Sequence, residues 1–298
     1  MACATTTGFP RICLIADDET QGAQIVILED GKLIAGDFVR LIDDSFAGTP
    51  LELDAEGAAF ADGFFYIIGS HGRPRHESGV DDNAKIDARA KASSQLFRIR
   101  FAPGSIDMKT GKLTAQPEKT RSLELAGIIR AQLTPFAESP LEENGVTVEG
   151  VAVRDGFLYA GLRGPVLEDH RAIILSVPLS VLFDHGAGDA TQLRPELGVD
   201  GMGNARGVRD LLVYEGRLLV LAGPVNDPPK GQPIKLGDYT VFSYGEGAEK
   251  LLDLEGYGNE IKPEALLPIG ESDGSIRALL FFDGPAGGQP TSIEVGFK

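Results

Sequence analysis

A short unit recurs along this sequence, and it limits the possible folds more than any other feature does. The segments 53–69 and 146–162 align without a gap, and each reads as a strand, an Asp-Gly turn and a second strand. A third copy spans 207–221 with Glu-Gly at the turn, and a fourth starts at Lys262 and resumes at Ile276. Asp-Gly turns between β-rich runs are the strongest short-range hairpin signal, because a type I′ turn needs positive φ at both central positions. Each copy therefore predicts a small antiparallel sheet.

A more degenerate copy lies at the start of the chain, where the run 11–17 ends on an acidic pair and 24–28 leads to the turn Asp30-Gly31. Further strands are expected after most copies, which makes each unit a four-stranded antiparallel sheet. Such sheets, repeated around an axis, form a β-propeller. Because the copies start near residues 12, 55, 148, 208 and 263, we predict an all-β propeller of five blades. Six blades are the alternative, since the interval between the second and third starts has room for one more.

The length of that interval has another explanation, which favours five blades. A polar insertion covers about 70–94, and a short helix is predicted over about 123–137. No Pro-rich or Ser-rich linker divides the chain, so residues 1–298 are interpreted as a single propeller domain.

The charge and hydropathy of the chain disfavour two classes of partner. Its 44 acidic and 28 basic side chains give a formal charge of −16, and the basic residues are scattered singly. A surface of this kind repels phosphodiester backbones, so no nucleic-acid partner is expected. No apolar run approaches the roughly 20 residues that a membrane-spanning helix needs, so no membrane association is expected either. Glycine supplies 38 of the 298 residues, nearly twice the usual share of roughly 7%, which agrees with many tight turns.

The first residues and the cysteines bear on the compartment. The N-terminus has neither a basic start nor an apolar stretch, so no secretion signal is recognised and a cytoplasmic location is expected. A chain trimmed to its mature start would look the same, which leaves a periplasmic or secreted location as the alternative. Cys3 and Cys13 are too few for a disulfide scaffold and lack metal-ligand spacing, so we interpret them as free thiols.

Five motifs in order along the chain carry a resemblance to a known family. They are Ile15-Ala16-Asp17-Asp18-Glu19, Gly69-Ser70-His71-Gly72-Arg73, Val148-Glu149-Gly150-Val151-Ala152, Arg206-Gly207-Val208-Arg209-Asp210 with Ala222-Gly223-Pro224, and Pro263-Glu264-Ala265. Together they resemble the bacterial family known as domain of unknown function 3616, with one departure at Phe282-Asp283-Gly284, where two successive acidic residues are expected. The resemblance implies a β-propeller and no known reaction. More distantly, the Glu-Gly strand starts resemble those of calcium-dependent propeller hydrolases, including apyrase-like nucleotidases, esterase-like phytases and gluconolactonases.

One position of the repeat is acidic, and a propeller would bring its copies together. The first strand of each blade lines the central channel, so residues at the same repeat position form a ring. Glu56, Glu149 and Glu264 occupy the position directly, while Asp17 and Asp210 lie at or beside it. Converging carboxylates repel one another, and a bound cation would neutralise them. Oxygen ligands in irregular number favour calcium, with magnesium as the alternative. In a competing interpretation these carboxylates accept hydrogen bonds from backbone amides of neighbouring blades and tie the sheets together.

The repeats also place basic side chains and a histidine near the expected ring. Arg73, Arg163 and Arg206 are candidates for holding an anionic substrate, because a guanidinium group binds carboxylate or phosphate with paired donors. Structural counter-ions are the competing interpretation, most of all for Arg209 beside the acidic position. His71 follows a strand end in a turn and is the best candidate for proton transfer, with an ordinary hydrogen-bonded loop histidine as the alternative.

These features lead to two hypotheses about function. The first is metal-assisted hydrolysis of a small anionic ester, phosphoanhydride or lactone at the channel, with Glu149 accepting a proton and His71 assisting. The second is a non-catalytic propeller that presents its rim loops to a protein partner. Solvent access to the acidic ring separates them, because a plugged channel admits no substrate.

Overall fold

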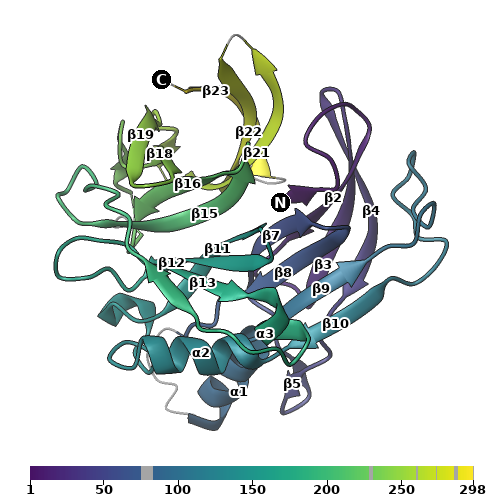
Figure 1. Cartoon of the computed structure of the whole chain (residues 1–298), viewed down its shortest axis with the longest axis horizontal. Helices are drawn as coiled ribbons and strands as arrows, with labels where there is room; N and C mark the ends of the chain where they lie inside the picture. Colours follow the sequence, from purple (N-terminus) through teal and green to yellow (C-terminus); the bar gives the residue numbers. More distant parts are fainter. Residues whose placement is uncertain (75–82, 228–230, 260, 273, 285–287, 298) are drawn as a thin grey trace.

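The described part of the chain forms a five-bladed β-propeller, as the repeats predict. The computed structural model describes residues 1–298 except 75–82, 228–230, 260, 273, 285–287 and 298. In Figure 1 the blades follow one another around a centre, and the first blade (purple) lies beside the fifth (yellow). The chain therefore closes a ring of five blades, and the alternative of six is wrong.

Four blades contain four antiparallel strands, and the fifth contains three among the described residues. The first comprises β1 (Ala2–Cys3), β2 (Arg11–Ala16), β3 (Gly22–Glu29) and β4 (Lys32–Arg40), and the second β7 (Ala55–Ala61), β8 (Phe64–Gly69), β9 (Leu96–Arg100) and β10 (Glu118–Ser122). The third comprises β11 (Thr147–Arg154), β12 (Phe157–Gly164), β13 (Ile174–Pro178) and β14 (Thr191–Leu193). The fourth comprises β15 (Arg206–Tyr214), β16 (Arg217–Pro224), β18 (Thr240–Tyr244) and β19 (Ala248–Asp253), and the fifth β21 (Lys262–Ser272), β22 (Ser275–Asp283) and β23 (Thr291–Gly296).

The remaining elements lie outside the blades. Two small hairpins pair β5 (Ser45–Phe46) with β6 (Thr49–Pro50) and β17 (Pro233–Ile234) with β20 (Gly258–Asn259). The helices are α1 (Asn83–Ser93), α2 (Glu124–Gln132) and α3 (Leu179–Phe183), with a 3₁₀ turn at Leu141–Glu143. Helix α2 falls within the predicted helix 123–137, and α1 lies in the predicted insertion 70–94, of which 75–82 are outside the described residues. None of the described helices has the length and apolar composition to cross a membrane.

The hairpin turns of the second and third blades have the expected backbone geometry. Both central residues have positive φ at Asp62 and Gly63 (51° and 80°), and the same holds at Asp155 and Gly156 (53° and 78°). This is the type I′ arrangement, whose twist matches that of the flanking strands. The inner strands β7, β11, β15 and β21 each begin such a hairpin, and consecutive members of this series pack against one another around the centre.

The first blade departs from the predicted register. The run 11–17, predicted as its inner strand, contributes β2, which is the second strand of the blade, and the innermost strand is β1. Since β1 has only two residues and no tight turn joins it to β2, no repeat signal marks it. Asp17 therefore follows a second strand, as Ser70 follows β8, and does not occupy the inner-strand position of Glu56.

The interpretation of the cysteines as free thiols is also wrong. Cys3 and Cys13 face each other in the β1–β2 ladder, with their Cα atoms 3.9 Å apart, and form a disulfide. The pairing depends on β1 lying against β2, and the sequence pattern gave no indication of that strand. The bond fixes the short inner strand of the first blade to its neighbour.

Reduction of this disulfide is expected to lower the free energy of unfolding by about 2–3 kcal/mol, because a cross-link over a short loop restricts the unfolded chain. The measurement is the urea midpoint with and without a thiol reductant. The matched control is a Cys3→Ala/Cys13→Ala double variant, whose midpoint should not respond to reductant. Equal midpoints for the oxidised and reduced wild type would contradict the prediction.

Candidate functional site

A β-bulge interrupts four inner strands at the repeat position that the sequence marks. The pairing skips one residue between Ala55 and Gly57 of β7, and the equivalent residue is skipped in β11, β15 and β21. The four extra residues are Glu56, Glu149, Arg209 and Glu264. A bulge leaves its extra residue unpaired and changes the direction of its side chain, and it is frequent next to functional sites. The acidic repeat position is thus a set of bulged residues, one of which is an arginine.

The glycine that follows two of these glutamates has a packing reason. A Cβ atom on Gly57 would lie 2.9 Å from Val151 Cγ1, and one on Gly150 would lie 2.7 Å from the backbone nitrogen of Leu211. Val151 and Leu211 belong to the inner strand of the next blade. The Glu-Gly pair of the repeat therefore combines a bulged acid with a close approach between adjacent blades.

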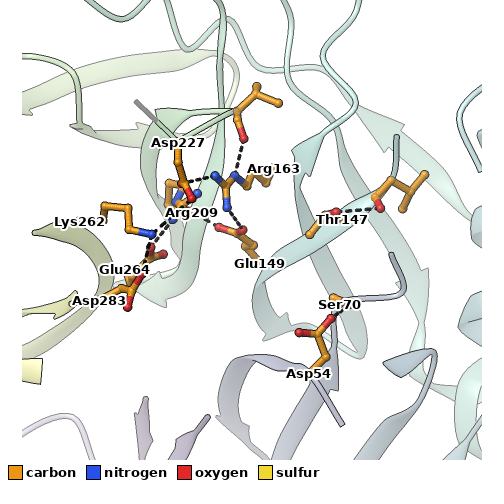
Figure 2. Close-up of polar contacts among 12 residues, drawn as sticks. Asp54, Ser70, Thr147, Glu149, Arg163, Arg209, Asp227, Lys262, Glu264 and Asp283 are labelled. Atoms are coloured by element: carbon orange, nitrogen blue, oxygen red, sulfur yellow. Dashed lines mark hydrogen bonds and ion pairs between the residues drawn. The ribbon is translucent and has the colours of Figure 1, made fainter. Parts of the chain in front are cut away.

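The bulged side chains of three blades form a buried charge network, drawn in Figure 2. Glu149 Oε1 accepts a hydrogen bond of 2.8 Å from Arg163 Nη1, and Glu149 Oε2 lies 3.1 Å from Arg209 Nε. Arg209 Nη2 also donates to Glu264 Oε1. Glu149 is thus held between two guanidinium groups, and Arg209 links the inner strands of the third, fourth and fifth blades.

The network continues outward to solvent through three residues that the sequence analysis did not identify. Arg163 Nη2 donates to Asp227 Oδ1 at 2.6 Å, and Lys262 Nζ lies 3.4 Å from Asp227 Oδ2 and 2.6 Å from Asp283 Oδ2. Side-chain exposure rises along this path from 5% at Glu149 to 55% at Asp283. The charged cluster therefore opens toward solvent on the side of Asp227 and Asp283.

Glu56 differs from the other bulged acids because no described basic side chain forms an ion pair with it. It is half-buried, and its carboxyl group makes no hydrogen bond or ion pair within the described part of the chain. Burial, followed by the negative charges of Glu149, Asp54 and Glu264, raises the pKa of Glu56 well above its usual value. The uncharged form of the Glu56 carboxyl group is therefore favoured more than in an exposed glutamate.

Glu264 titrates in an intermediate range. Burial raises the pKa of its carboxyl group to about 7, and Glu149 adds to this rise while Arg209 opposes it. On the other side of Glu56, burial raises the pKa of Asp54, which accepts a hydrogen bond from Ser70 Oγ. Burial and neighbouring negative charge therefore raise the pKa of both Glu56 and Glu264, and at Glu264 the guanidinium group of Arg209 opposes the rise.

Two of the predicted ring residues lie elsewhere or have another role. Asp210 is buried, and its two oxygens accept hydrogen bonds of 2.8 Å from the N–H groups of Leu211 and Leu266. Because Leu266 belongs to β21, Asp210 ties the fourth blade to the fifth, as the competing interpretation of the acidic ring expected. Asp17 is exposed in the loop after β2, where its Oδ1 accepts a 3.0 Å hydrogen bond from the N–H of Glu19.

These contacts bear on the expected metal site. No group of three or more His, Cys, Asp and Glu side chains among the described residues is arranged to hold a metal ion. Glu149 and Glu264 are engaged by arginine and Asp210 by backbone amides, so the five predicted ligands do not form one ligand set. Of the five, Glu56 is the one whose carboxyl group no described residue engages through a hydrogen bond or an ion pair.

The predicted anion-binding arginines are all engaged with other groups. Arg163 lies in the network, and its Nε also donates to Val225 O at 2.5 Å, so each of its three nitrogens has an acceptor. Arg206 lies apart from the network, where its nitrogens donate to the carbonyl groups of Leu197, Gly237 and Asp238. Arg73 is 3.9 Å from Asp87 and 3.6 Å from Glu138. The structure brings only Arg163 of these three to the acidic cluster.

His71 is buried and neutral. Its φ is +52°, its Nδ1 lies 2.8 Å from Gly69 O, and its Nε2 is buried without a hydrogen-bond partner among the described residues. Burial lowers the pKa of His71 to about 4, against the opposing effect of the Gly69 carbonyl. The neutral ring fits the loop-histidine interpretation more closely than a role in proton transfer near pH 7.

Protonation of His71 is expected to destabilise the fold in mild acid. Histidine in an unfolded chain binds a proton near pH 6.5, whereas His71 in the folded protein does so near pH 4. The stability that depends on its neutral ring is therefore complete above pH 6.5 and is lost as the pH falls toward 4. Between pH 7 and pH 5 the loss should be about 2 kcal/mol, measured by urea unfolding.

The matched variant for this prediction is His71→Asn, because asparagine tolerates a positive φ better than most residues. Its stability should depend less steeply on pH between 7 and 5 than that of the wild type. His185→Asn, in an exposed turn, should keep the wild-type slope. Identical slopes for wild type and His71→Asn would refute the assignment.

Most of this chain matches the model of a protein family. The model of a family described as "Protein of unknown function (DUF3616)" matches residues 4–287. No curated protein matches the sequence. Among solved structures, the crystal structure of polysaccharide lyase Uly1 aligns with 96% of this chain and 55% of its own, at 11% identity and a TM-score of 0.32. The chain thus spans about half the length of that structure, and a similarity this weak shows neither a shared site nor a shared reaction.

Proposed function

Because this chain belongs to the DUF3616 family, whose description names no reaction, we propose a function from its own residues. The proposal is hydrolysis of a small ester, phosphoanhydride or lactone at the central channel. Glu56 is the proton donor, and Glu149 is the proton acceptor. The observation that carries the proposal is the contrast between these neighbouring glutamates, one unpaired with a raised pKa and the other held by two arginines.

Two carboxyl groups in different surroundings suit acid–base hydrolysis. A neutral carboxylic acid can protonate a leaving oxygen, and a carboxylate can take a proton from the attacking water. In this reaction Glu149 gains the water proton while Glu56 loses its own. Before the next turnover Glu149 must release that proton and Glu56 must regain one, so the net proton count is unchanged. Glu264, whose pKa is near 7, is placed to exchange that proton with solvent. Arg163 and Arg209 act as positioning residues, because they hold the Glu149 carboxylate in place.

The contacts of the arginines bear on the substrate class. An anionic substrate needs free donors, whereas the three nitrogens of Arg163 already have acceptors and Arg206 and Arg73 are engaged elsewhere. The residues at the open side include Asp227 and Asp283, with Lys262 between them. An uncharged ester or lactone therefore suits the site better than an anionic one.

A divalent cation, calcium before magnesium, is proposed as a partner of Asp54 and Asp18, beside Glu56, whose own carboxyl group stays the proton donor. The support is electrostatic, because the negative charges of Asp54 and Asp18 contribute to the raised pKa of Glu56. Oxygen ligands of this type favour calcium. The geometry does not form a complete ligand set, so no step of the proposed reaction uses the cation.

The substitution Glu56→Gln is expected to reduce hydrolysis about 100-fold, because glutamine cannot donate the leaving-group proton. The measurement is kcat/KM on a panel of ester, nucleotide and lactone substrates, run with calcium and with chelator. Glu52→Gln, an exposed change on the same segment, should leave activity unchanged. Full activity in Glu56→Gln would remove the proposed acid.

The proposed cation is tested separately, through the melting temperature with calcium and with chelator. A melting temperature that responds to neither calcium nor chelator would remove the proposed cation, since an ion bound only to the folded form must stabilise it.

A non-catalytic propeller remains the second candidate, and one observation favours it. The buried charges join the third, fourth and fifth blades to one another, which is what a rigid scaffold needs. Under this hypothesis no substrate of the panel is turned over, and Glu56→Gln stabilises the protein, because an amide cannot carry the negative charge that the neighbouring carboxylates disfavour.

The disulfide supports one of the alternatives for location. Cross-links of this kind persist in oxidising compartments and are rare in the cytosol. We therefore favour a periplasmic or secreted location over the cytoplasm.

A further inference from the structure

Two hollows flank the outer strand of the fourth blade, away from the charge network. The first, of about 610 Å³, lies between the loop after β14, the loop before β18 and one face of β19. The second, of about 520 Å³, borders the opposite face at the start of β19, and Ala248 lines both. The edge of β19 and these two hollows, one on each face of the strand, are together called the groove.

Exposed apolar side chains gather at the first hollow. Leu236 is 70% exposed and Met202 is 64% exposed, which makes them the two most exposed large apolar side chains in the described part of the chain. Val199, at 42%, lies in the same loop as Met202, and both Val199 and Leu236 line the hollow. Apolar residues held together in solvent at a concave site are typical of an interaction surface.

Hydrogen bonds hold the two loops in place. Asp238 Oδ1 accepts from the N–H of Gly201 at 2.9 Å, and its Oδ2 accepts from the N–H of Lys235 at 2.7 Å. Asp200 Oδ1 accepts from the N–H groups of Met202 and Asn204 at 2.9 and 2.8 Å. The exposed apolar residues are therefore carried by a preorganised frame, which reduces the entropy that a partner must overcome on binding.

The charges along the groove favour a basic partner. Glu196, Glu246 and Glu249 are exposed carboxylates along it. Of the basic side chains, Lys250 is paired with Asp253 at 2.7 Å, Arg206 donates to carbonyl groups, and Arg217 lies over the Phe297 ring. A second copy of this chain, with its own charge of −16, would be repelled.

We propose that the groove beside β19 binds an extended, basic peptide segment of another protein. An apolar side chain of the segment enters the hollow between Val199 and Leu236, and basic side chains lie beside Glu246 and Glu249. An extended segment fits because β19 ends its sheet, and no described strand pairs with its outer edge. Addition of a strand at such an edge supplies backbone hydrogen bonds, while pockets for alternate side chains supply specificity.

The test uses a displayed library of random 12-residue peptides, selected on the intact protein. We expect enrichment of segments that combine an apolar residue with lysine or arginine. The strongest peptide, synthesised with a fluorescent label, should bind at least 10-fold more weakly to Leu236→Asp and to Val199→Asp. Its affinity should also fall as salt is added. Hydrogen exchange should show protection of β19 on binding.

The matched control is Leu123→Asp, which changes an exposed leucine before α2 and should bind the peptide like the wild type. Both groove residues are exposed, so the variants should keep the wild-type melting temperature. Three results would overturn the proposal: no enriched peptide family, enrichment of acidic peptides, or equal affinity for wild type and Leu236→Asp. None of these readouts depends on hydrolysis at Glu56.

Discussion

Replacing Arg209 with methionine is expected to lower the free energy of unfolding by about 3–5 kcal/mol, because the change leaves buried carboxylates without their counter-charge. Arg209 is 2% exposed and pairs with Glu149 of the third blade and Glu264 of the fifth. Its guanidinium group also lies over the Tyr239 ring, 6.0 Å from the centroid. Methionine fills much of the same volume, so the loss measures charge more than packing. The measurement is urea unfolding at pH 7.

The matched control for this change is Arg217→Met, an exposed arginine on the neighbouring strand β16, which should cost less than about 1 kcal/mol. A second variant tests the cause. Glu149 keeps its ion pair with Arg163, so the carboxylate that loses its arginine partner is Glu264. Adding Glu264→Gln to Arg209→Met removes that carboxylate and should recover part of the lost stability, as a double-mutant cycle measures. A midpoint for Arg209→Met equal to that of the control would mean that the buried pairs contribute nothing net.

The repeat pattern predicts the fold and the meeting of the bulged residues, because hairpin turns and strand alternation are local signals. It also shows that the side chain at this position is positively charged in the fourth blade. Arg209 occupies the position held by glutamate elsewhere, and a cation inserted among acids at one repeat position produces ion pairs. The expectation of a carboxylate ring neutralised by a bound divalent cation gave too little weight to this substitution.

Other parts of the site could not be predicted from the repeat pattern. Asp227 and Lys262 lie outside the aligned positions, and their contacts depend on how the loop after β16 folds against the start of β21. The unpaired state of Glu56 depends equally on three-dimensional neighbours, since burial and the charges of Glu149 and Asp54 raise its pKa. The β1 strand is too short for any periodic signal, and the disulfide could not be predicted without it.

A buried arginine connects the first and fifth blades where the ring closes, and replacing it is expected to lower the free energy of unfolding by a similar amount. Arg11 in β2 is buried, and its Nη1 and Nη2 donate to the carbonyl groups of Pro268 and Ile269 at 2.9 and 2.8 Å, while its Nε donates to Gly8 O at 2.7 Å. Pro268 and Ile269 belong to β21, so one side chain connects the first blade to the fifth. The apolar cluster at this junction has only Cys13, Leu28 and Leu267 as fully buried members among the described residues, fewer than at the other junctions.

Arg11→Met should therefore cost about 3–5 kcal/mol, since three carbonyl groups lose a charged donor in a buried setting. Arg11→Lys should recover a fraction, because one ammonium group cannot reach three separated carbonyls. Hydrogen exchange should accelerate first in β2 and β21, where the ring would open. Arg277→Met, an exposed change on β22, is the control and should stay within about 0.5 kcal/mol of wild type. If Arg11→Met were as mild as that control, the hydrogen bonds of Arg11 would not be what closes the ring, and the small apolar cluster would have to do so. Unfolding would then not be expected to begin at the junction of the first and fifth blades.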